Sequence, residues 1–469
     1  MSEARVMTAA GLEEGRVKAF ASELRGELIR PGDENYEAAR RVYNGMVDKR
    51  PGLIARCADT ADVIAAVNFA RQNGLELAIR GGGHNVAGMG LSDGGLVIDL
   101  SLMNSVHVDP QERTARVQGG CTLGEVDHAT HAFGLGIPSG FISSTGIAGL
   151  TLGGGFGYLS RKYGLTIDSL LEVDLVLADG SFVTASEQKH PDLFWSVRGG
   201  GGNFGVATSF KFQLHPVDKV IGGPTLWSMD QAKEVMQWYR EFILQAPEEL
   251  NGFFALMTVP PAPPFPEELH MKKMCGVVWC YCGPAEAAEE IFKPVQKMGP
   301  PALYGVHEMP YPVLQSAFDG LYPAGLQWFW RADFVNELSD EAIERHIEYG
   351  LQSPSVHSTM HLYPIDGAVH RVGRNDTPFS HRQSNWAEII AGVDPDPRNA
   401  ERIKQWVVDY WEALHPYSTG GAYVNFLMEE GARRIQATYR DNYERLATNK
   451  KKYDPTNLFH INQNIQPSG

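Results

Sequence analysis

Strand-type and helix-type segments alternate along the first part of the chain. Residues 13–38 have the pattern of a polar-faced helix. Asp59 to Asp62 provide an N-cap for a helix over Val63–Asn73, and Gly74 ends this helix. Short apolar runs predict strands over residues 51–57, 75–79 and 94–100. The alternation predicts an α+β or α/β layered arrangement.

The middle of the chain alternates longer helices with short strands. Helices are predicted over Asp230–Leu244, Ser339–Tyr349 and Pro397–Leu414, and strands over Ser358–Tyr363 and Asn385–Val393. This pattern favours a sheet covered by helices.

Length and charge limit the classes of protein and partner. A chain of 469 residues exceeds what one hydrophobic core usually serves, so two domains are expected. A net charge of −15 argues against nucleic acid or an anionic membrane surface as a partner. No stretch is apolar and long enough to span a bilayer, and Met1–Arg5 lead into no apolar signal core, so we expect a cytoplasmic protein. The glycine-rich and aromatic-rich composition is compatible with a homodimer.

Five cysteines do not form a disulfide framework in a chain of this length. Cys275, Cys280 and Cys282 lie in a run that alternates with apolar and aromatic residues, which indicates a strand with thiols as small hydrophobic groups. No metal-binding motif is present, and we expect no metal site.

Three glycine clusters carry the strongest chemical signal. The first, residues 79–88, places Gly81, Gly82 and Gly83 between two predicted strands and just before His84. Such a turn lets backbone N–H groups approach an anion, and a diphosphate would suit it, although a tight structural turn has the same pattern. The second cluster covers residues 140–157 and the third covers residues 198–206.

Together these clusters resemble the FAD-binding domain of the vanillyl-alcohol-oxidase type, also called the PCMH type. Within it, the chain is similar to the flavin oxidases related to berberine bridge enzyme and 6-hydroxy-D-nicotine oxidase. The similarity runs from Arg56 to Gly205 and resumes at Tyr423–Phe426 and Tyr453–Ile465. It implies an α+β fold with three parts: an FAD-binding domain over 1–215 with its core at about 48–215, an antiparallel-sheet substrate domain covered by helices over 216–420, and a return to the FAD-binding domain over 421–469.

The resemblance implies FAD bonded covalently to His84. Many relatives have a second link through a cysteine about eleven positions before Gly153, but Ile142 stands there, so one bond is expected and Cys121 is interpreted as packing. The other implied cofactor residues are Arg80, Gly81, Gly82, Gly83, Asn85, Ser143, Ser144, Thr145, Gly146, Gly149, Gly153, Gly154, Gly155, Gly157, Val206, Asn462 and Gln463.

Tyr423 and Asn425 are the implied catalytic residues. They stand two apart, which predicts the same side of a strand. In oligosaccharide-oxidising relatives the tyrosine of this unit is the proposed base that takes the substrate's hydroxyl proton. A phenol with a pKa of about 10 needs stabilisation of its anion to act in this way. The alternative is an aromatic ring packed under the flavin.

The substrate is expected between the second domain and the flavin. Candidate contacts are Trp328, Trp330, His361, Tyr363, Trp386 and Glu388. The resemblance implies an FAD-dependent oxidoreductase that oxidises an alcohol, sugar, amine or aromatic secondary metabolite by hydride transfer, with dioxygen as acceptor and hydrogen peroxide as product. Three alternatives remain: a dehydrogenase with another acceptor, an oxidase or cyclase of natural-product biosynthesis, and a non-catalytic binding protein.

Overall fold

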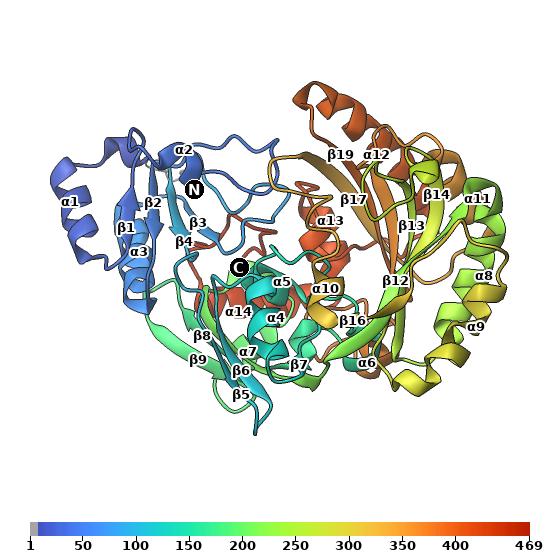
Figure 1. The fold of residues 1–469 in the computed structure, drawn as a ribbon. Coiled ribbons are helices and arrows are strands. Elements are labelled where there is room, and N and C mark those ends of the chain that lie inside the picture. Colours follow the sequence, from blue (N-terminus) through green and yellow to red (C-terminus); the bar gives the residue numbers. More distant parts are fainter. Residues whose placement is uncertain (1–7) are drawn as a thin grey trace.

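Two lobes face each other in the computed structural model, which describes residues 8–469 (Figure 1). The expectation for Met1–Arg5 therefore lies outside the described residues. The first lobe carries β1–β10 and the second carries the large sheet β12–β19, while the C-terminal segment returns to lie between them (Figure 1). The chain is α+β, as predicted. Between residues 8 and 469, no helix combines the length and the apolarity that crossing a membrane requires.

A four-stranded sheet, in the order β1-β2-β4-β3, supports the first glycine cluster. Its strands are β1 (Glu27–Ile29), β2 (Leu53–Arg56), β3 (Leu77–Arg80) and β4 (Leu96–Asp99), and β2 and β3 both run parallel to β4. Helix α3 (Thr60–Asn73) connects β2 to β3. The predicted cap is confirmed, because the Asp59 carboxylate accepts from the N–H groups of Ala61 and Asp62, and Gly74 closes the helix at φ 60°.

The helix expected over residues 13–38 is wrong. The structure has α1 (Glu14–Glu23), then β1, then the short α2 (Tyr36–Ala39). Tertiary contacts override the local pattern, because the carboxylate of Asp62 accepts hydrogen bonds from the N–H groups of Arg25 and Gly26. These bonds turn the chain into β1, which pairs with β2.

A five-stranded antiparallel sheet, in the order β5-β6-β10-β8-β9, forms the rest of the first lobe. Its strands are β5 (Val106–Asp109), β6 (Thr114–Gln118), β8 (Leu170–Val176), β9 (Phe182–Ser186) and β10 (Val206–Gln213), and a small pair joins β7 (Leu135–Gly136) to β11 (His215–Pro216). The helices here are α4 (Leu123–His131), α5 (Ile147–Gly153), α6 (Ser160–Tyr163), α7 (Pro191–Val197) and α14 (Asn442–Tyr453). Thr122 and Glu125 form a capping box that starts α4.

The second lobe is an antiparallel sheet with helices on its outer face, as predicted (Figure 1). The strands are β12 (Lys219–Ser228), β13 (Leu250–Thr258), β14 (Lys273–Tyr281), β15 (Leu303–Tyr304), β16 (His307–Pro310), β17 (Gln327–Val335), β18 (Thr359–Pro364) and β19 (Trp386–Asp394). The covering helices are α8 (Ala232–Gln245), α9 (Ala288–Lys297), α11 (Asp340–Gly350) and α12 (Ala400–Leu414), and the short α10 (Tyr311–Gln315) faces the first lobe. The strand expected around Cys275 and Cys280 is β14, where both thiols are buried.

Side-chain alternation decides which residues of this sheet face the first lobe. Along β19, Trp386 and Ile390 belong to the core beneath the helices, whereas Ile389 and Ala391 line the space between the lobes. Along β17, Phe329 belongs to the helix-side core and Trp330 lines that space. The period of two therefore assigns every strand residue to a structural face or to the inter-lobe face.

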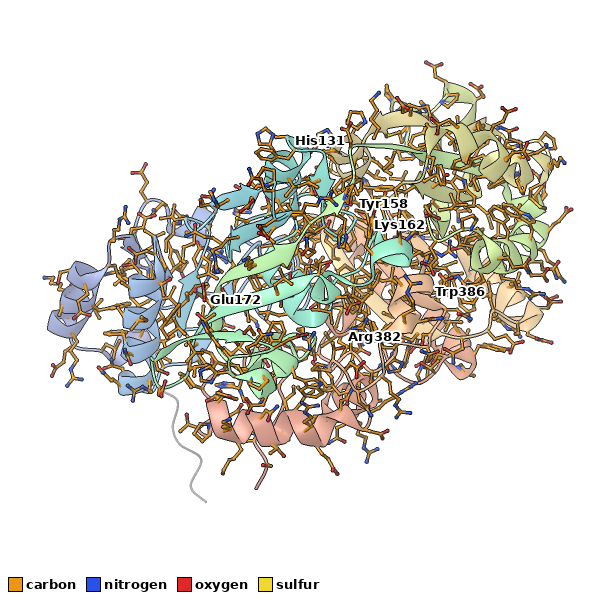
Figure 2. All side chains as sticks on the ribbon, turned by 90° about the horizontal axis from the view of Figure 1, so that it is seen from below. His131, Tyr158, Lys162, Glu172, Arg382 and Trp386 are labelled. Carbon is orange, nitrogen blue, oxygen red and sulfur yellow. The ribbon has the colours of Figure 1, made fainter. Side chains whose placement is uncertain are left out.

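Two buried ion pairs fasten the lobes together. Arg382, labelled near the junction of the lobes in Figure 2, donates to both oxygens of Asp168, at 2.7 and 2.8 Å. Arg161 of α6 donates to both oxygens of Asp366, at 2.7 and 3.0 Å. Each pair is bidentate, so it fixes orientation as well as distance.

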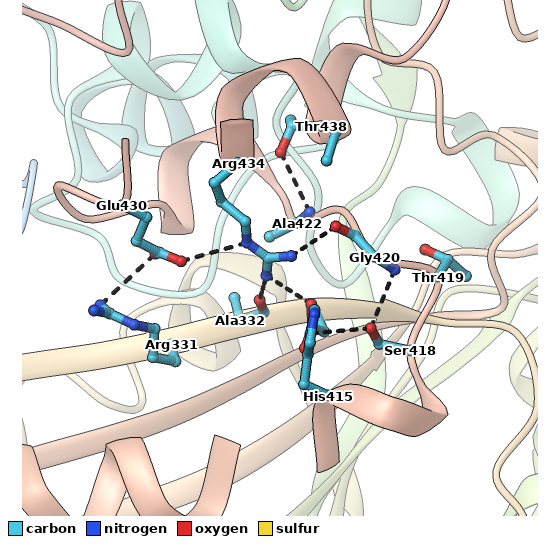
Figure 3. Close-up of polar contacts among 12 residues, drawn as sticks. Arg331, Ala332, His415, Ser418, Thr419, Gly420, Ala422, Glu430, Arg434 and Thr438 are labelled. Carbon is cyan, nitrogen blue, oxygen red and sulfur yellow. Dashed lines mark hydrogen bonds and ion pairs between the residues drawn. The ribbon is translucent and has the colours of Figure 1, made fainter. Parts of the chain in front are cut away.

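Arg434 of α13 (Ala432–Tyr439) holds the C-terminal return against the second lobe (Figure 3). It donates to Asp333 Oδ1 and to the carbonyl of Ala332, each at 2.6 Å, and to the carbonyl of Gly420 at 2.7 Å. Glu430 flanks the same guanidinium at 3.3 Å. The chain between Gly420 and Arg434 is thereby fixed at both ends.

We expect Arg434→Met to lower the free energy of unfolding by about 3–5 kcal/mol, because the buried carboxylate of Asp333 loses its main partner. The measurement is urea unfolding of the purified protein. Arg433→Met on the same helix is the control, since Arg433 is exposed and its loss should stay within about 0.5 kcal/mol. Equal stability of the two variants would contradict a stabilising role for the contacts of Arg434 with Asp333, Ala332 and Gly420.

Candidate active site

A cavity of about 350 Å³ lies between the lobes. It brings together most of the residues that the sequence singled out. Those that line it are Arg80, Gly81, Gly82, Gly83, His84, Asn85, Thr145, Gly146, Gly149, Trp328, Trp330, His361, Tyr363, Tyr423, Asn425, Asn462 and Gln463. Segments far apart in the sequence therefore build a single site.

The first two glycine clusters cross in backbone-to-backbone contact. A Cβ on Gly82 would lie 2.3 Å from the Gly146 nitrogen, and a Cβ on Gly146 would lie 2.3 Å from the Gly82 nitrogen. Across the described part of the chain, no hydrogen bond uses the N–H groups of Gly82, Gly83 or His84. A turn with free N–H groups beside a cavity has the donor set that a diphosphate requires.

Arg80 supports this turn from behind. Its guanidinium donates to Asp99 Oδ2 at 2.6 Å and to the Ala39 carbonyl at 2.5 Å. Because the charge is already paired with a buried carboxylate, the side chain fixes the end of β3, and the backbone N–H groups are what remains for an anion.

His84 is held by two hydroxyl groups and one ring. Its Nε2 lies 2.9 Å from Ser144 Oγ and its Nδ1 lies 3.4 Å from Thr145 Oγ1. The ring stacks on Tyr43 with a centroid separation of 3.9 Å. Burial lowers the pKa of His84 to about 4, so the imidazole is neutral near pH 7. A neutral imidazole with one weakly engaged nitrogen is a competent nucleophile.

Other predicted cofactor residues do not line the cavity. Ser143 is occupied by Asp319, which accepts from both its N–H and its hydroxyl. Val206 is buried in the core of the first lobe, while its neighbours Gly205 and Ala207 line the cavity. Gly153, Gly154, Gly155 and Gly157 are buried and shape the wall from behind, whereas Ser144 is exposed and lies beside His84.

Tyr423 and Asn425 do not lie on a strand, so that expectation was wrong. Tyr423 precedes the 3-10 helix Val424–Phe426, where a tight turn replaces the extended backbone. The two side chains meet nevertheless, because Asn425 Nδ2 donates to Tyr423 Oη at 2.8 Å. Glycine makes this possible, since a Cβ on Gly153 would lie 2.3 Å from Asn425 Oδ1.

The Tyr423 oxygen accepts a second hydrogen bond, from the Gly155 N–H at 2.9 Å. Burial raises the pKa of Tyr423 above the usual phenol value, while the donors from Gly155 and Asn425 act in the opposite direction. Tyr423 is therefore a neutral phenol at pH 7, and its anion would have two donors ready.

Four of the six substrate candidates face the cavity, and two do not. Trp328, Trp330, His361 and Tyr363 line it. Trp386 and Glu388 point to the opposite face of the sheet, so these expectations were wrong. Trp386 lies in the helix-side core, and Glu388 lies 3.8 Å from His346 Nε2 of α11. Period-two alternation excludes them, because they share the parity of Ile390 rather than that of Ile389.

His361 and Tyr363 form a polar pair on the inner face of β18. His361 Nδ1 lies 2.6 Å from Tyr363 Oη. Burial lowers the pKa of His361 to about 3, which keeps the imidazole neutral.

Sequence reasoning missed the other aromatic residues of the wall. These are Tyr43, Phe141, Phe156, Phe253, Phe318, Tyr322, Phe426 and Phe459. Strand parity could have found Phe253, which precedes the helix-side Phe254 on β13. Tyr43 and Phe318 lie outside strands, and no local signal marks them.

The cavity fits a flavin dinucleotide. The glycine crossing brings backbone rather than side chains to the cavity surface, and the free N–H groups suit the diphosphate. At the other end, the buried Oδ1 of Asn462 has no partner among the described residues and can accept from a ligand N–H. Within residues 8–469, no three His, Cys, Asp or Glu side chains gather in a way that could hold a metal ion.

Known proteins match both halves of this site. Residues 51–186 match the family described as FAD binding domain, and residues 422–466 match the one described as berberine and berberine like. An FAD-linked oxidoreductase of Dictyostelium discoideum is 34% identical over 96% of this chain and 97% of its own length. The (R)-6-hydroxynicotine oxidase of Paenarthrobacter nicotinovorans is 30% identical over 95% of this chain and 98% of its own length.

The fold agrees with these matches. The crystal structure of 6-hydroxy-D-nicotine oxidase from Arthrobacter nicotinovorans superposes with a TM-score of 0.86 and 27% identity, over 95% of this chain and 98% of that one. The protein is therefore an FAD-dependent oxidoreductase, and it belongs to the berberine bridge enzyme-like and 6-hydroxynicotine oxidase-like family of FAD-linked oxidases.

Proposed function

We propose that this enzyme is an oxidase that carries FAD on a single covalent bond to His84 and passes electrons from a small organic substrate to dioxygen, with hydrogen peroxide as product. One observation carries the proposal: the glycine turn, His84 and Tyr423 line the same cavity. When bound, FAD accepts a hydride from the substrate carbon and returns two electrons to the acceptor.

His84 is suited to the covalent bond by its protonation state and its contacts. A proton on Nε2 can be donated to Ser144 Oγ at 2.9 Å, which leaves the lone pair of Nδ1 for the bond. The Tyr43 ring stacked on the imidazole restricts its rotation. No thiol lies at the position of a second link, since Ile142 lines the cavity there and Cys121 is fully buried in the core.

Tyr423 is the proposed base. Its oxygen is held by the Gly155 N–H and by Asn425 Nδ2, and these two donors stabilise negative charge on that oxygen. A substrate hydroxyl beside the ionised form of Tyr423 would lose its proton to the phenolate oxygen as hydride leaves the adjacent carbon. His361, neutral and on the opposite wall, is the competing candidate.

We expect His84→Ala to release its FAD on acid precipitation, leaving a colourless pellet, whereas the wild-type pellet stays yellow. Mass analysis of the peptide that contains His84 measures the attachment. His107→Ala is the control, because His107 is exposed on β5 and should leave the bond intact. Flavin that remains covalently bound to His84→Ala would refute the assignment.

We expect Tyr423→Phe to slow anaerobic flavin reduction by about 10²–10⁴-fold with unchanged FAD content. Tyr439→Phe is the matched control, since that buried hydroxyl has no partner among the described residues.

The pH profile separates the two candidate bases. Because the pKa of Tyr423 is raised above the usual phenol value, the anionic fraction grows with pH, and the wild-type reduction rate should rise about tenfold per pH unit from pH 6 to 9. Tyr423→Phe should lose this slope. A flat wild-type profile over that range would instead indicate His361, whose imidazole, with a pKa of about 3, is already neutral there.

Slow reoxidation of the reduced enzyme in air, followed by an oxygen electrode, would replace the oxidase proposal with a dehydrogenase that uses another acceptor.

A further inference from the structure

The substrate side of the cavity has almost no charge. Among the described residues that line the cavity, none is Asp, Glu or Lys, and the one arginine, Arg80, is paired with Asp99. The acidic pair Asp333 and Glu388 lies on the other face of the sheet. A charged substrate would therefore lose its hydration on entering the cavity and would find no ionic partner there.

Aromatic side chains close into a ring around this space. Its members are Trp328, Trp330, Phe426, Tyr363, Phe253, Phe318 and Tyr322, all of which line the cavity. Consecutive ring centroids lie 5.2 to 6.4 Å apart around the whole circuit. Such spacings are those of offset or edge-to-face contacts, which an inserted aromatic ring would extend.

Polar groups in the ring are few and are mostly donors. The indole N–H groups of Trp328 and Trp330 are buried and have no acceptor among the described residues. His361 Nδ1 and Tyr363 Oη satisfy each other at 2.6 Å. Two free donors and a scarcity of acceptors suit a ligand that carries one or two oxygen acceptors on an apolar body.

Sugars and amines fit this space poorly. Each sugar hydroxyl needs an acceptor for its proton, and an unpaired buried hydroxyl loses much of the affinity gained elsewhere. An aliphatic amine is a cation near neutral pH, and its desolvation outweighs the attraction of aromatic faces when no carboxylate is near. An alcohol supplies an oxidisable C–H bond without charge.

We propose that the substrate is an uncharged aromatic alcohol, with its ring inside the aromatic ring of the wall and its hydroxyl toward Tyr423. The inference rests on the proposed oxidase function. The carbinol C–H bond breaks as hydride passes to the flavin, the hydroxyl proton passes to the oxygen of ionised Tyr423, and the carbonyl product leaves. Dioxygen then takes the two electrons and one proton from the reduced flavin and the second proton from Tyr423, which returns to its ionised form, and becomes hydrogen peroxide.

Flavin bleaching under anaerobic conditions tests the class of substrate. The holoenzyme is mixed with benzyl alcohol, cyclohexylmethanol, benzylamine or cellobiose at equal concentration. We expect benzyl alcohol to reduce the flavin at least about tenfold faster than any of the others, because only it combines an aromatic ring with an uncharged carbinol.

Binding without turnover gives a second readout. Methoxybenzene cannot be oxidised by this route, and its binding is measured from the shift of the flavin absorption spectrum. We expect methoxybenzene to bind about tenfold more tightly than methoxycyclohexane. Trp330→Leu should remove most of this preference, and Trp330→Phe should retain it. Phe329→Leu is the control on the same strand, because Phe329 faces the helices.

Faster reduction by cellobiose or benzylamine than by benzyl alcohol would refute the proposed aromatic alcohol substrate but would not contradict the proposed oxidase function. Equal binding of methoxybenzene and methoxycyclohexane would overturn it as well. A purified protein that contains no FAD and takes up none would overturn both this inference and the proposed function.

Discussion

The crossing of Gly82 with Gly146 is the constraint on which the site depends. Each glycine occupies the space that a Cβ on the other would need, so both positions must lack a side chain for the two loops to touch. This contact sets the distance from the first glycine turn to the 143–145 segment. The hydrogen bonds from His84 to Ser144 and Thr145 then follow from backbone packing. The imidazole of His84 is therefore positioned by a steric requirement two residues away.

The C-terminal return completes the site through buried polar contacts. Lys450 is fully buried and donates to Asp454 at 2.7 Å, to the Asn203 carbonyl at 2.7 Å and to the Phe459 carbonyl at 2.9 Å. These bonds join the third glycine cluster to the segment that carries Asn462. Arg434 joins the other end of the return to β17. Because a buried charge without its partners is costly, the return has one low-energy position, and Tyr423 shares it.

Much of this arrangement could be predicted from the sequence, and the failures have physical causes. Local signals sufficed for α3, whose cap and terminal glycine act within a few residues. The prediction of one helix over residues 13–38 failed because Asp62, which is distant in sequence, accepts hydrogen bonds from the backbone N–H groups of Arg25 and Gly26. The prediction that Trp386 and Glu388 contact the substrate failed because residue type alone suggested them. Only their position in the alternation along β19 shows that they face the helices and not the cavity. The other four members of the aromatic ring were missed for a related reason: the ring is built from β13, β17, β18, the loop between α10 and β17, and the turn Val424–Phe426, and no linear spacing connects these segments.

The same scarcity of charged groups in the cavity lining that favours an uncharged substrate also governs the chemistry of Tyr423. Burial raises the pKa of its phenol, so the resting side chain keeps its proton, while two N–H donors stay directed at the oxygen. Negative charge on that oxygen is therefore costly when nothing else in the cavity changes, but it needs no reorganisation of the protein once it forms. A substrate hydroxyl that replaces water beside Tyr423 would couple proton loss to hydride departure without a competing solvent. The uncharged aromatic wall and the raised pKa of Tyr423 thus have related causes: the acidic side chains of Asp333 and Glu388 point to the helix side of the sheet and not into the cavity, and burial beside this wall raises the pKa of the phenol.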